Sequence, residues 1–93
     1  MIKVTEFQRL PKYEKQYAKL SPEIQTAVDA ALDLLITNPT ASSLRCHPLH
    51  GFRPTIWKID VLPNKSWQIT FELRSTTAVL RKVAPHSELD RSP

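Results

Sequence analysis

The chain has 93 residues, with 13 Lys plus Arg, 9 Asp plus Glu and a formal net charge of +4. This length predicts one domain over residues 1–93, small but able to bury a core, and the mild positive charge suits an RNA backbone or an acidic partner without excluding an ordinary domain. The single cysteine, Cys46, excludes an internal disulfide and disfavours a structural zinc site. Residues 1–6 lack the apolar segment of a signal peptide, and the longest apolar run, 30–36, is too short to span a membrane. We therefore expect a cytoplasmic protein without a membrane partner.

The first elements of the chain are predicted to be a strand and a short helix. Lys3–Phe7 favours β structure, so we expect a strand there. Apolar residues then recur every three or four positions, as on one face of a helix. Pro11 suits the first turn of this helix, where its missing N–H is not needed. The members of the apolar face are Leu10, Tyr13, Tyr17 and Leu20.

A second helix has signals at both of its ends. Ser21 is expected to be the N-cap and Pro22 the first helical residue. The helix should end at Asn38, because a residue before proline is displaced from the helical region. Its apolar face comprises Ile24, Val28, Ala31, Leu32 and Leu35. Since almost no linker separates the two helices, we expect an antiparallel helix hairpin that covers the apolar side of a sheet.

The second half of the chain predicts a β-hairpin after a loop. Thr40–Pro54 is expected to be the loop, with Gly51 at a position of positive φ. Ile56–Leu62 and Ser66–Leu73 each alternate between apolar and polar residues, which is typical of half-buried strands. The residues between them, 63–65, read Pro-Asn-Lys and are typical of a turn.

The length of this turn predicts how the two strands pair. A three-residue loop fixes which residue of the second strand lies opposite each residue of the first. A shift of this pairing by one position would expose half of the apolar residues. The expected pairs are Trp57 with Phe71 and Ile59 with Ile69 on the apolar face, and Lys58 with Thr70 and Asp60 with Gln68 on the polar face.

Thr77–Val83 predicts a third strand, although the connection before it leaves its register open. A two-residue loop would place Arg81 on the polar face, and a three-residue loop would place Lys82 there. A short helical turn is expected after Pro85. The sequence thus predicts an α+β fold with an N-terminal strand, an antiparallel helix hairpin, a three-stranded antiparallel meander and a short C-terminal turn.

The order of these elements resembles the RelE/ParE superfamily of bacterial type II toxins. The segments that carry the resemblance are 38–39 (NP), 44–51 (LRCHPLHG), 57–61 (WKIDV), 66–71 (SWQITF) and 83–89 (VAPHSEL). The resemblance covers nearly the whole chain and lies in the order and spacing of short segments. It implies a RelE/ParE-like toxin that a cognate antitoxin protein holds inactive. Many members are ribonucleases that need no metal or other cofactor and cut mRNA on the ribosome.

Three residues match positions that such ribonucleases use. Lys58 matches a lysine of RelE-like members, His86 a C-terminal histidine of YoeB- and YafQ-like members, and His47 the histidine of a His-Pro-Leu segment in YafQ-like members. The resemblance therefore implies that these three are catalytic. The residues expected to bind RNA or to support them are Gln68, Asp60, Arg53, Arg81 and Lys82.

Other positions depart from the superfamily pattern. Gln68 stands where active members usually have arginine, and Asp60 stands where RelE has a second lysine. Leu89 or Asp90 stands where many members have tyrosine or phenylalanine. Each departure removes a cation or a stacking ring, so we expect a weakened nuclease.

Metal-free RNA cleavage uses the 2′-hydroxyl of the substrate as nucleophile. It needs a base for the 2′ proton, cations for the charge on the phosphate and an acid for the 5′ leaving oxygen. Histidine can be either base or acid near neutral pH, so we assign His86 and His47 to proton transfer and Lys58 to the phosphate. We expect no metal site, because His47 and His50 have no acidic or cysteine partner at a suitable spacing.

Two alternatives from other classes stay open. A ParE-like member would inhibit DNA gyrase without being an enzyme, and a module without nuclease activity would only bind its antitoxin. The discriminating features are His86, Lys58 and the residue at position 68. The first two favour the ribonuclease, and Gln68 does not.

Overall fold

The computed structural model of the chain describes residues 2–61 and 67–93, without the side chains of residues 90 and 91. Its elements in chain order are β1 (Glu6–Arg9), α1 (Pro11–Ala18), α2 (Pro22–Thr37), β2 (His47–Leu49), β3 (Ile56–Asp60), β4 (Trp67–Arg74), β5 (Thr77–Pro85) and α3 (His86–Arg91). The strands form one sheet in the order β1-β5-β4-β3-β2, in which only β1 and β5 are parallel neighbours. The expected α+β fold, with a helix hairpin before an antiparallel meander, is confirmed.

α2 begins and ends where the sequence predicts. The Ser21 hydroxyl accepts a hydrogen bond from the backbone N–H of Ile24 at 3.4 Å, and Pro22 is the first helical residue. Asn38 is the C-cap, directly before Pro39. The buried residues of α2 are Val28, Ala31, Leu32 and Leu35.

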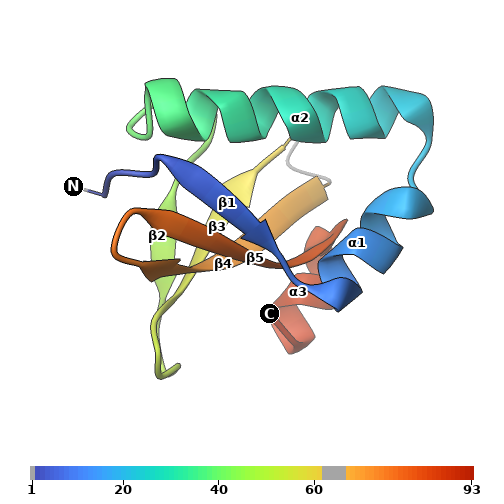
Figure 1. Ribbon diagram of the computed structural model, residues 1–93. Helices are drawn as coiled ribbons and strands as arrows, with labels where there is room; N and C mark the ends of the chain where they lie inside the picture. Colours follow the sequence, from blue (N-terminus) through green and yellow to red (C-terminus); the bar gives the residue numbers. More distant parts are fainter. Residues whose placement is uncertain (1, 62–66) are drawn as a thin grey trace.

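α1 and α2 cover one face of the sheet, to which the apolar residues of the strands point. One core cluster joins Tyr13 of α1 and Leu32 of α2 with Ile59, Ile69 and Phe71 of the strands. Figure 1 shows α2 along this side of the sheet and α3 on the opposite side. None of the described helices is long and apolar enough to cross a membrane.

The register of β3 and β4 is the predicted one. The observed pairs are Trp57 with Phe71, Lys58 with Thr70, Ile59 with Ile69 and Asp60 with Gln68. The expected turn at 63–65 lies outside the described residues. The hairpin therefore separates an apolar face, under α1 and α2, from a polar face on the other side.

The register of β5 answers the question that the sequence left open. A two-residue turn joins β4 to β5, which by itself would place Arg81 opposite Thr70. The register shifts before that point, so that Thr70 pairs with Lys82 instead. Arg81 is thus the extra residue of a β-bulge. Its side chain bonds Glu72, which alternates with Thr70 along β4, so both cations belong to the polar side of the sheet.

The first strand is shifted along the chain relative to the prediction of Lys3–Phe7. The parallel ladder begins where Glu6 pairs with Thr77, and it continues to Arg9. The strand therefore starts where β5 offers a partner. It ends just before Pro11, where α1 begins.

The prediction of a loop over Thr40–Pro54 is wrong in part, because this segment contains β2. The strand has three residues and lies at the edge of the sheet, where Pro48 is tolerated because an edge strand needs fewer N–H donors. Its short length and its proline leave no alternating pattern in the sequence. Gly51 has a φ of 88°, and its expected positive φ is confirmed.

Candidate active site

Four polar residues from four neighbouring strands form one row on the polar face. His47 of β2 pairs with Lys58 of β3, Lys58 pairs with Thr70 of β4, and Thr70 pairs with Lys82 of β5. Directly opposed residues point to the same side of a sheet, so all four lie on the side away from α2. Neighbouring strands are about 4.8 Å apart, so the row extends over roughly 14 Å.

A hydrogen-bonded chain lies beside this row and ends at His86, the first residue of α3. Gln68 Nε2 donates to Asp60 Oδ1 at 2.7 Å, and His86 Nδ1 lies 2.9 Å from Gln68 Oε1. A carboxylate only accepts hydrogen bonds, so the Gln68 amide must turn its NH₂ group to Asp60 and its oxygen to His86. His86 Nδ1 must then donate. In the neutral imidazole this places the lone pair on Nε2.

The polar face of the sheet is buried, although the alternating sequence of its strands alone predicts a face that is exposed to solvent. Lys58, Asp60, Gln68 and Thr70 have exposed fractions of 7%, 2%, 3% and 0%. α3 packs against β4 and β5, and its Leu89 is 2% exposed. Leu89 is thus a packing residue of α3. His86, at the start of α3, is exposed to solvent.

Asp60 is held by the loop before β2 as well as by Gln68. Its backbone N–H donates to the Leu44 carbonyl at 2.7 Å. Asp60 Oδ2 lies 3.7 Å from Arg45 Nε and makes no hydrogen bond within the described residues, so this contact is one of charge only. The Arg45 carbonyl lies 2.5 Å from His47 Nδ1, which must therefore donate. Arg45 thus contacts both Asp60 and His47.

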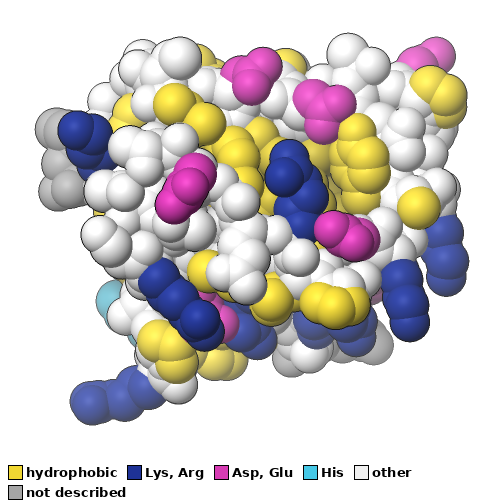
Figure 2. All heavy atoms as spheres, viewed as in Figure 1, with side chains coloured by type: hydrophobic (Ala, Val, Ile, Leu, Met, Phe, Trp, Pro, Cys, Tyr) yellow, Lys and Arg dark blue, Asp and Glu magenta, His cyan; other side chains and the backbone are white. Residues whose placement is uncertain are grey.

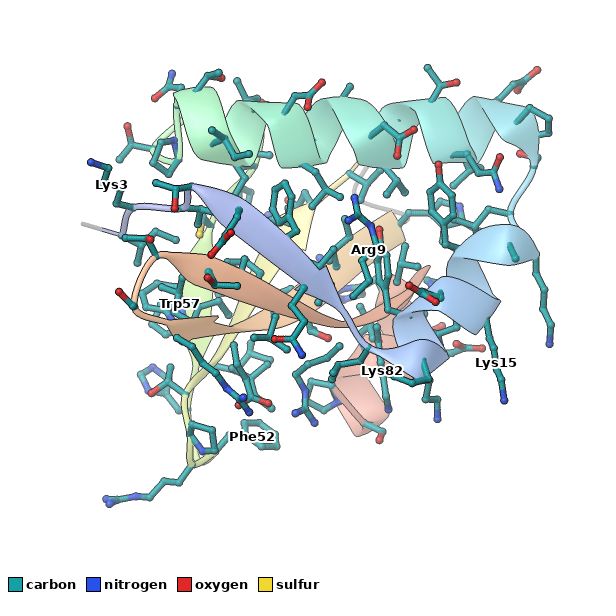
Figure 3. The ribbon with its side chains drawn as sticks, in the orientation of Figure 1. Lys3, Arg9, Lys15, Phe52, Trp57 and Lys82 are labelled. Carbon is teal, nitrogen blue, oxygen red and sulfur yellow. The ribbon has the colours of Figure 1, made fainter. Side chains whose placement is uncertain are left out.

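The cations Arg81 and Arg53 differ in their surroundings. Arg81 Nη1 donates to Glu72 Oε2 at 2.5 Å, and the Glu72 side chain is only 10% exposed. This ion pair compensates the charge of Arg81. Arg53 is exposed in the loop between β2 and β3, which also carries Phe52 (Figure 3).

Lys82 lies beside α3 in Figure 3 and reaches the end of the chain. Its Nζ donates to the Ser92 carbonyl at 2.6 Å and to Ser92 Oγ at 2.9 Å. Burial lowers the pKa of Lys82, the positive charges of Lys12 and Arg81 lower it further, and Glu88 acts in the opposite direction. Lys82 therefore sits where an added negative charge would be favourable.

Two residues of this site were not among the predicted site residues. Thr70 lies in the middle of the row, and its position was already implied by the predicted pairing with Lys58. Arg45 has a φ of 47°, a conformation that is uncommon outside glycine, and no sequence pattern indicates its contacts.

No group of three or more His, Cys, Asp or Glu side chains that could hold a metal ion occurs in the described part of the chain. His50 is exposed in the turn after β2.

A hollow lies between β1 and the two helices α1 and α2, on the face shown in Figure 2. Its volume is about 560 Å³ and Arg9 is in its lining. Asp29 and Asp33 also line it, and Tyr17 donates its hydroxyl hydrogen to Asp29. With two carboxylates for one guanidinium, this hollow is less suited to a phosphate than the polar face of the sheet.

Comparisons with known proteins bear on the fold. No family model matches the sequence, and no curated protein matches it. The chain is similar to the Escherichia coli DinJ–YafQ toxin–antitoxin complex, with a TM-score of 0.71 and 20% identity over 95% of this chain and 98% of that chain. For the RelB–RelE complex of Methanococcus jannaschii the values are 0.68 and 16% over 92% and 99%, and for the isolated E. coli RelE toxin 0.65 and 15% over 91% and 94%. The chain therefore has the fold of the RelE and YafQ toxins, as its sequence resemblance predicts.

Proposed function

We propose that this protein is the toxin of a toxin–antitoxin pair and that it cleaves mRNA without a metal ion. The observation that carries the proposal is the chain from Asp60 through Gln68 to His86, beside the row that contains Lys58 and Lys82. The fold supports the toxin assignment. Because the similar YafQ and RelE structures include complexes with DinJ and RelB, we expect an antitoxin protein to bind this chain too.

In this proposal His86 is the base that accepts the proton of the RNA 2′-hydroxyl. Gln68 holds the Nδ1–H of His86, so Nε2 is the nitrogen that accepts a proton. Asp60 acts through Gln68, because a flipped amide would place its oxygen against the carboxylate. Gln68 and Asp60 are therefore positioning residues, which fix the tautomer and the orientation of the imidazole.

The reaction is an in-line displacement at phosphorus. The 2′ oxygen forms a bond to phosphorus and gives its proton to His86, and the bond from phosphorus to the 5′ oxygen breaks. The products are a 2′,3′-cyclic phosphate and a 5′-hydroxyl end. Lys58 and Lys82 would stabilise the negative charge that builds on the phosphate oxygens.

The leaving 5′ oxygen needs a proton, and His47 is the proposed donor. His47 and Thr70 lie on the two strands that flank β3, about 10 Å apart by strand spacing. A phosphate above Lys58 would lie between them, within reach of side chains from both sides.

The missing charge at Gln68 predicts a slow enzyme. One charged contact to the transition state is commonly worth about 3 kcal/mol, or roughly a hundredfold in rate. Glutamine gives up this contact and instead orients His86. We therefore expect cleavage that is weaker than an arginine at this position would support.

Cleavage of mRNA in a translating extract, followed by primer extension, tests the proposal. The wild type should give discrete cuts, His86→Gln should lose at least about a hundredfold in rate, and the matched control His50→Gln, at an exposed histidine, should cut like the wild type. Intact mRNA with the wild type, or full activity of His86→Gln, would overturn the ribonuclease. Inhibition of DNA gyrase supercoiling by a protein that leaves mRNA intact would instead favour the non-enzymatic alternative.

A further inference from the structure

The last two residues of the chain lie on the polar face of the sheet. Thr70 Oγ1 donates to the Pro93 carbonyl at 2.8 Å, and Lys82 Nζ donates to the Ser92 carbonyl at 2.6 Å and to Ser92 Oγ at 2.9 Å. These two donors are direct partners in the β4–β5 ladder. Two neighbouring residues of the tail thus present oxygen atoms to one pair of donors.

Thr70 lies on the central strand of three paired strands and is 0% exposed, so the position of its hydroxyl is fixed. Its oxygen is nevertheless bonded to the tail, 23 residues further along the chain. A hydroxyl that is buried on a sheet face and directed at an oxygen atom from another segment is a fixed donor. A ligand with several oxygen acceptors would find this donor already in position.

The donors of this site carry positive charge. Lys82 contributes an ammonium group, and Lys58 lies on the other side of Thr70 in the row. Lys12 and Arg81 are further positive charges near Lys82, and Glu88 is a negative one. A phosphate group carries negative charge and several oxygen acceptors, so it would satisfy the same donors.

We propose that Thr70 and Lys82 form a phosphate-binding site, and that the backbone oxygens of Ser92 and Pro93 occupy it until an RNA phosphate displaces them. This inference rests on the proposed function for its choice of RNA. It adds Thr70 as a direct phosphate ligand and assigns the tail a regulatory role at the site. The tail follows α3, whose first residue is His86, so the element that carries the proton-transfer group also carries the segment that must leave.

Binding of an uncleavable RNA tests this inference apart from catalysis. The probe is a fluorescent oligoribonucleotide with 2′-O-methyl groups, measured by anisotropy. A chain ending at Arg91 should bind the probe at least about threefold more tightly than the full chain, because no bound fraction of tail has to be displaced. Thr70→Val should weaken binding by about five- to tenfold in the shortened chain and by less in the full chain, where it also loosens the tail, and Thr70→Ser should retain binding.

Lys82→Gln and a matched lysine control test the charge. Lys82→Gln should weaken binding and reduce the slope of log affinity against log salt by about 0.7, as expected for one contact to a single strand. Lys15→Gln, at an exposed lysine of α1, should leave both values unchanged. Circular dichroism spectra of all variants identify any that fail to fold. The shortened chain keeps every strand and helix, so its result stands independently of the substitutions.

The possible results separate this inference from the proposed function. Equal affinities of the full and shortened chains, together with an unchanged affinity of Thr70→Val, would overturn the phosphate site even if mRNA is cut. Tighter binding by the shortened chain would support it even if the wild type cuts no mRNA. Inorganic phosphate is the second probe: if it competes with the RNA, the shared ligand is the phosphate group, and if it binds while the RNA does not, the assignment to RNA is overturned.

Discussion

Replacement of Gln68 by leucine should destabilise the protein through Asp60. Leucine is apolar and one bond shorter than glutamine, so the substitution removes the donor that lies 2.7 Å from Asp60 Oδ1. Asp60 is 2% exposed, and its Oδ2 makes no hydrogen bond among the described residues. Among the contacts between described side chains, the carboxylate would then keep the one with Arg45 at 3.7 Å.

The expected loss in the free energy of unfolding is about 2 kcal/mol, because a hydrogen bond to a charged group contributes about 1.5–3 kcal/mol and little water can replace the lost donor. The His86 bond adds little, since His86 is exposed. Urea denaturation followed by tryptophan fluorescence measures this quantity. Gln8→Leu, at an exposed glutamine of β1, is the control and should change stability by no more than about 0.5 kcal/mol.

A double-mutant cycle gives the sharper result. Asp60→Val leaves the buried Gln68 amide without its acceptor and should also destabilise, whereas the double variant removes both polar partners and should recover much of the loss. The coupling energy should be about 2 kcal/mol. A loss below about 0.5 kcal/mol for Gln68→Leu, or additive effects in the cycle, would refute the buried hydrogen bond.

Three further predictions concern single side chains. Burial raises the pKa of the Cys46 thiol from 9.0 to about 11, so Ellman's reagent should react roughly a hundredfold more slowly with the folded protein than with the urea-unfolded chain at mildly alkaline pH, and equal rates would contradict this. Burial also raises the pKa of Tyr13 from 10.0 to about 12; the charge of Arg9 acts to lower this pKa, and Asp29 and Tyr17 act to raise it. The folded protein therefore keeps this proton while the unfolded chain loses it, so the stabilising effect is full below pH 10 and is lost as the pH rises toward 12. Tyr13→Phe should remove this loss, and a tyrosinate absorbance titration of both proteins should show one late-titrating tyrosine fewer. Phe71 is 0% exposed in the core, so its replacement by alanine should lower the free energy of unfolding by about 3–5 kcal/mol. A much smaller loss in urea denaturation would place Phe71 outside the core.

The β3–β4 pairing could be predicted because two independent constraints agree. The alternation of Trp57, Ile59, Ile69 and Phe71 requires one buried face, and the parity of the connection allows only one register that provides it. The opposition of Asp60 and Gln68 follows from the same argument. The link from Gln68 to His86 does not, because it depends on the direction in which α3 leaves β5.

Other features have no local signal in the sequence. The bulge at Arg81 depends on how β5 meets β4, and it brings both Arg81 and Lys82 to the polar side, where the sequence offers a choice between them. β2 is a three-residue edge strand with a proline, too short for a periodic pattern. The burial of the polar face depends on α3 and on the tail, whose contacts with Thr70 and Lys82 join residues far apart in the sequence.

The tautomer of His86 tests the central claim most directly. Long-range ¹H–¹⁵N correlation spectra distinguish the two ring nitrogens of a neutral histidine and show which one carries the proton. If Asp60 and Gln68 orient the imidazole, the wild type should carry its proton on Nδ1, and this preference should disappear in Gln68→Leu. A neutral His86 that carries its proton on Nε2 in the wild type would contradict the account, because Nε2 could not then accept the proton of an RNA 2′-hydroxyl.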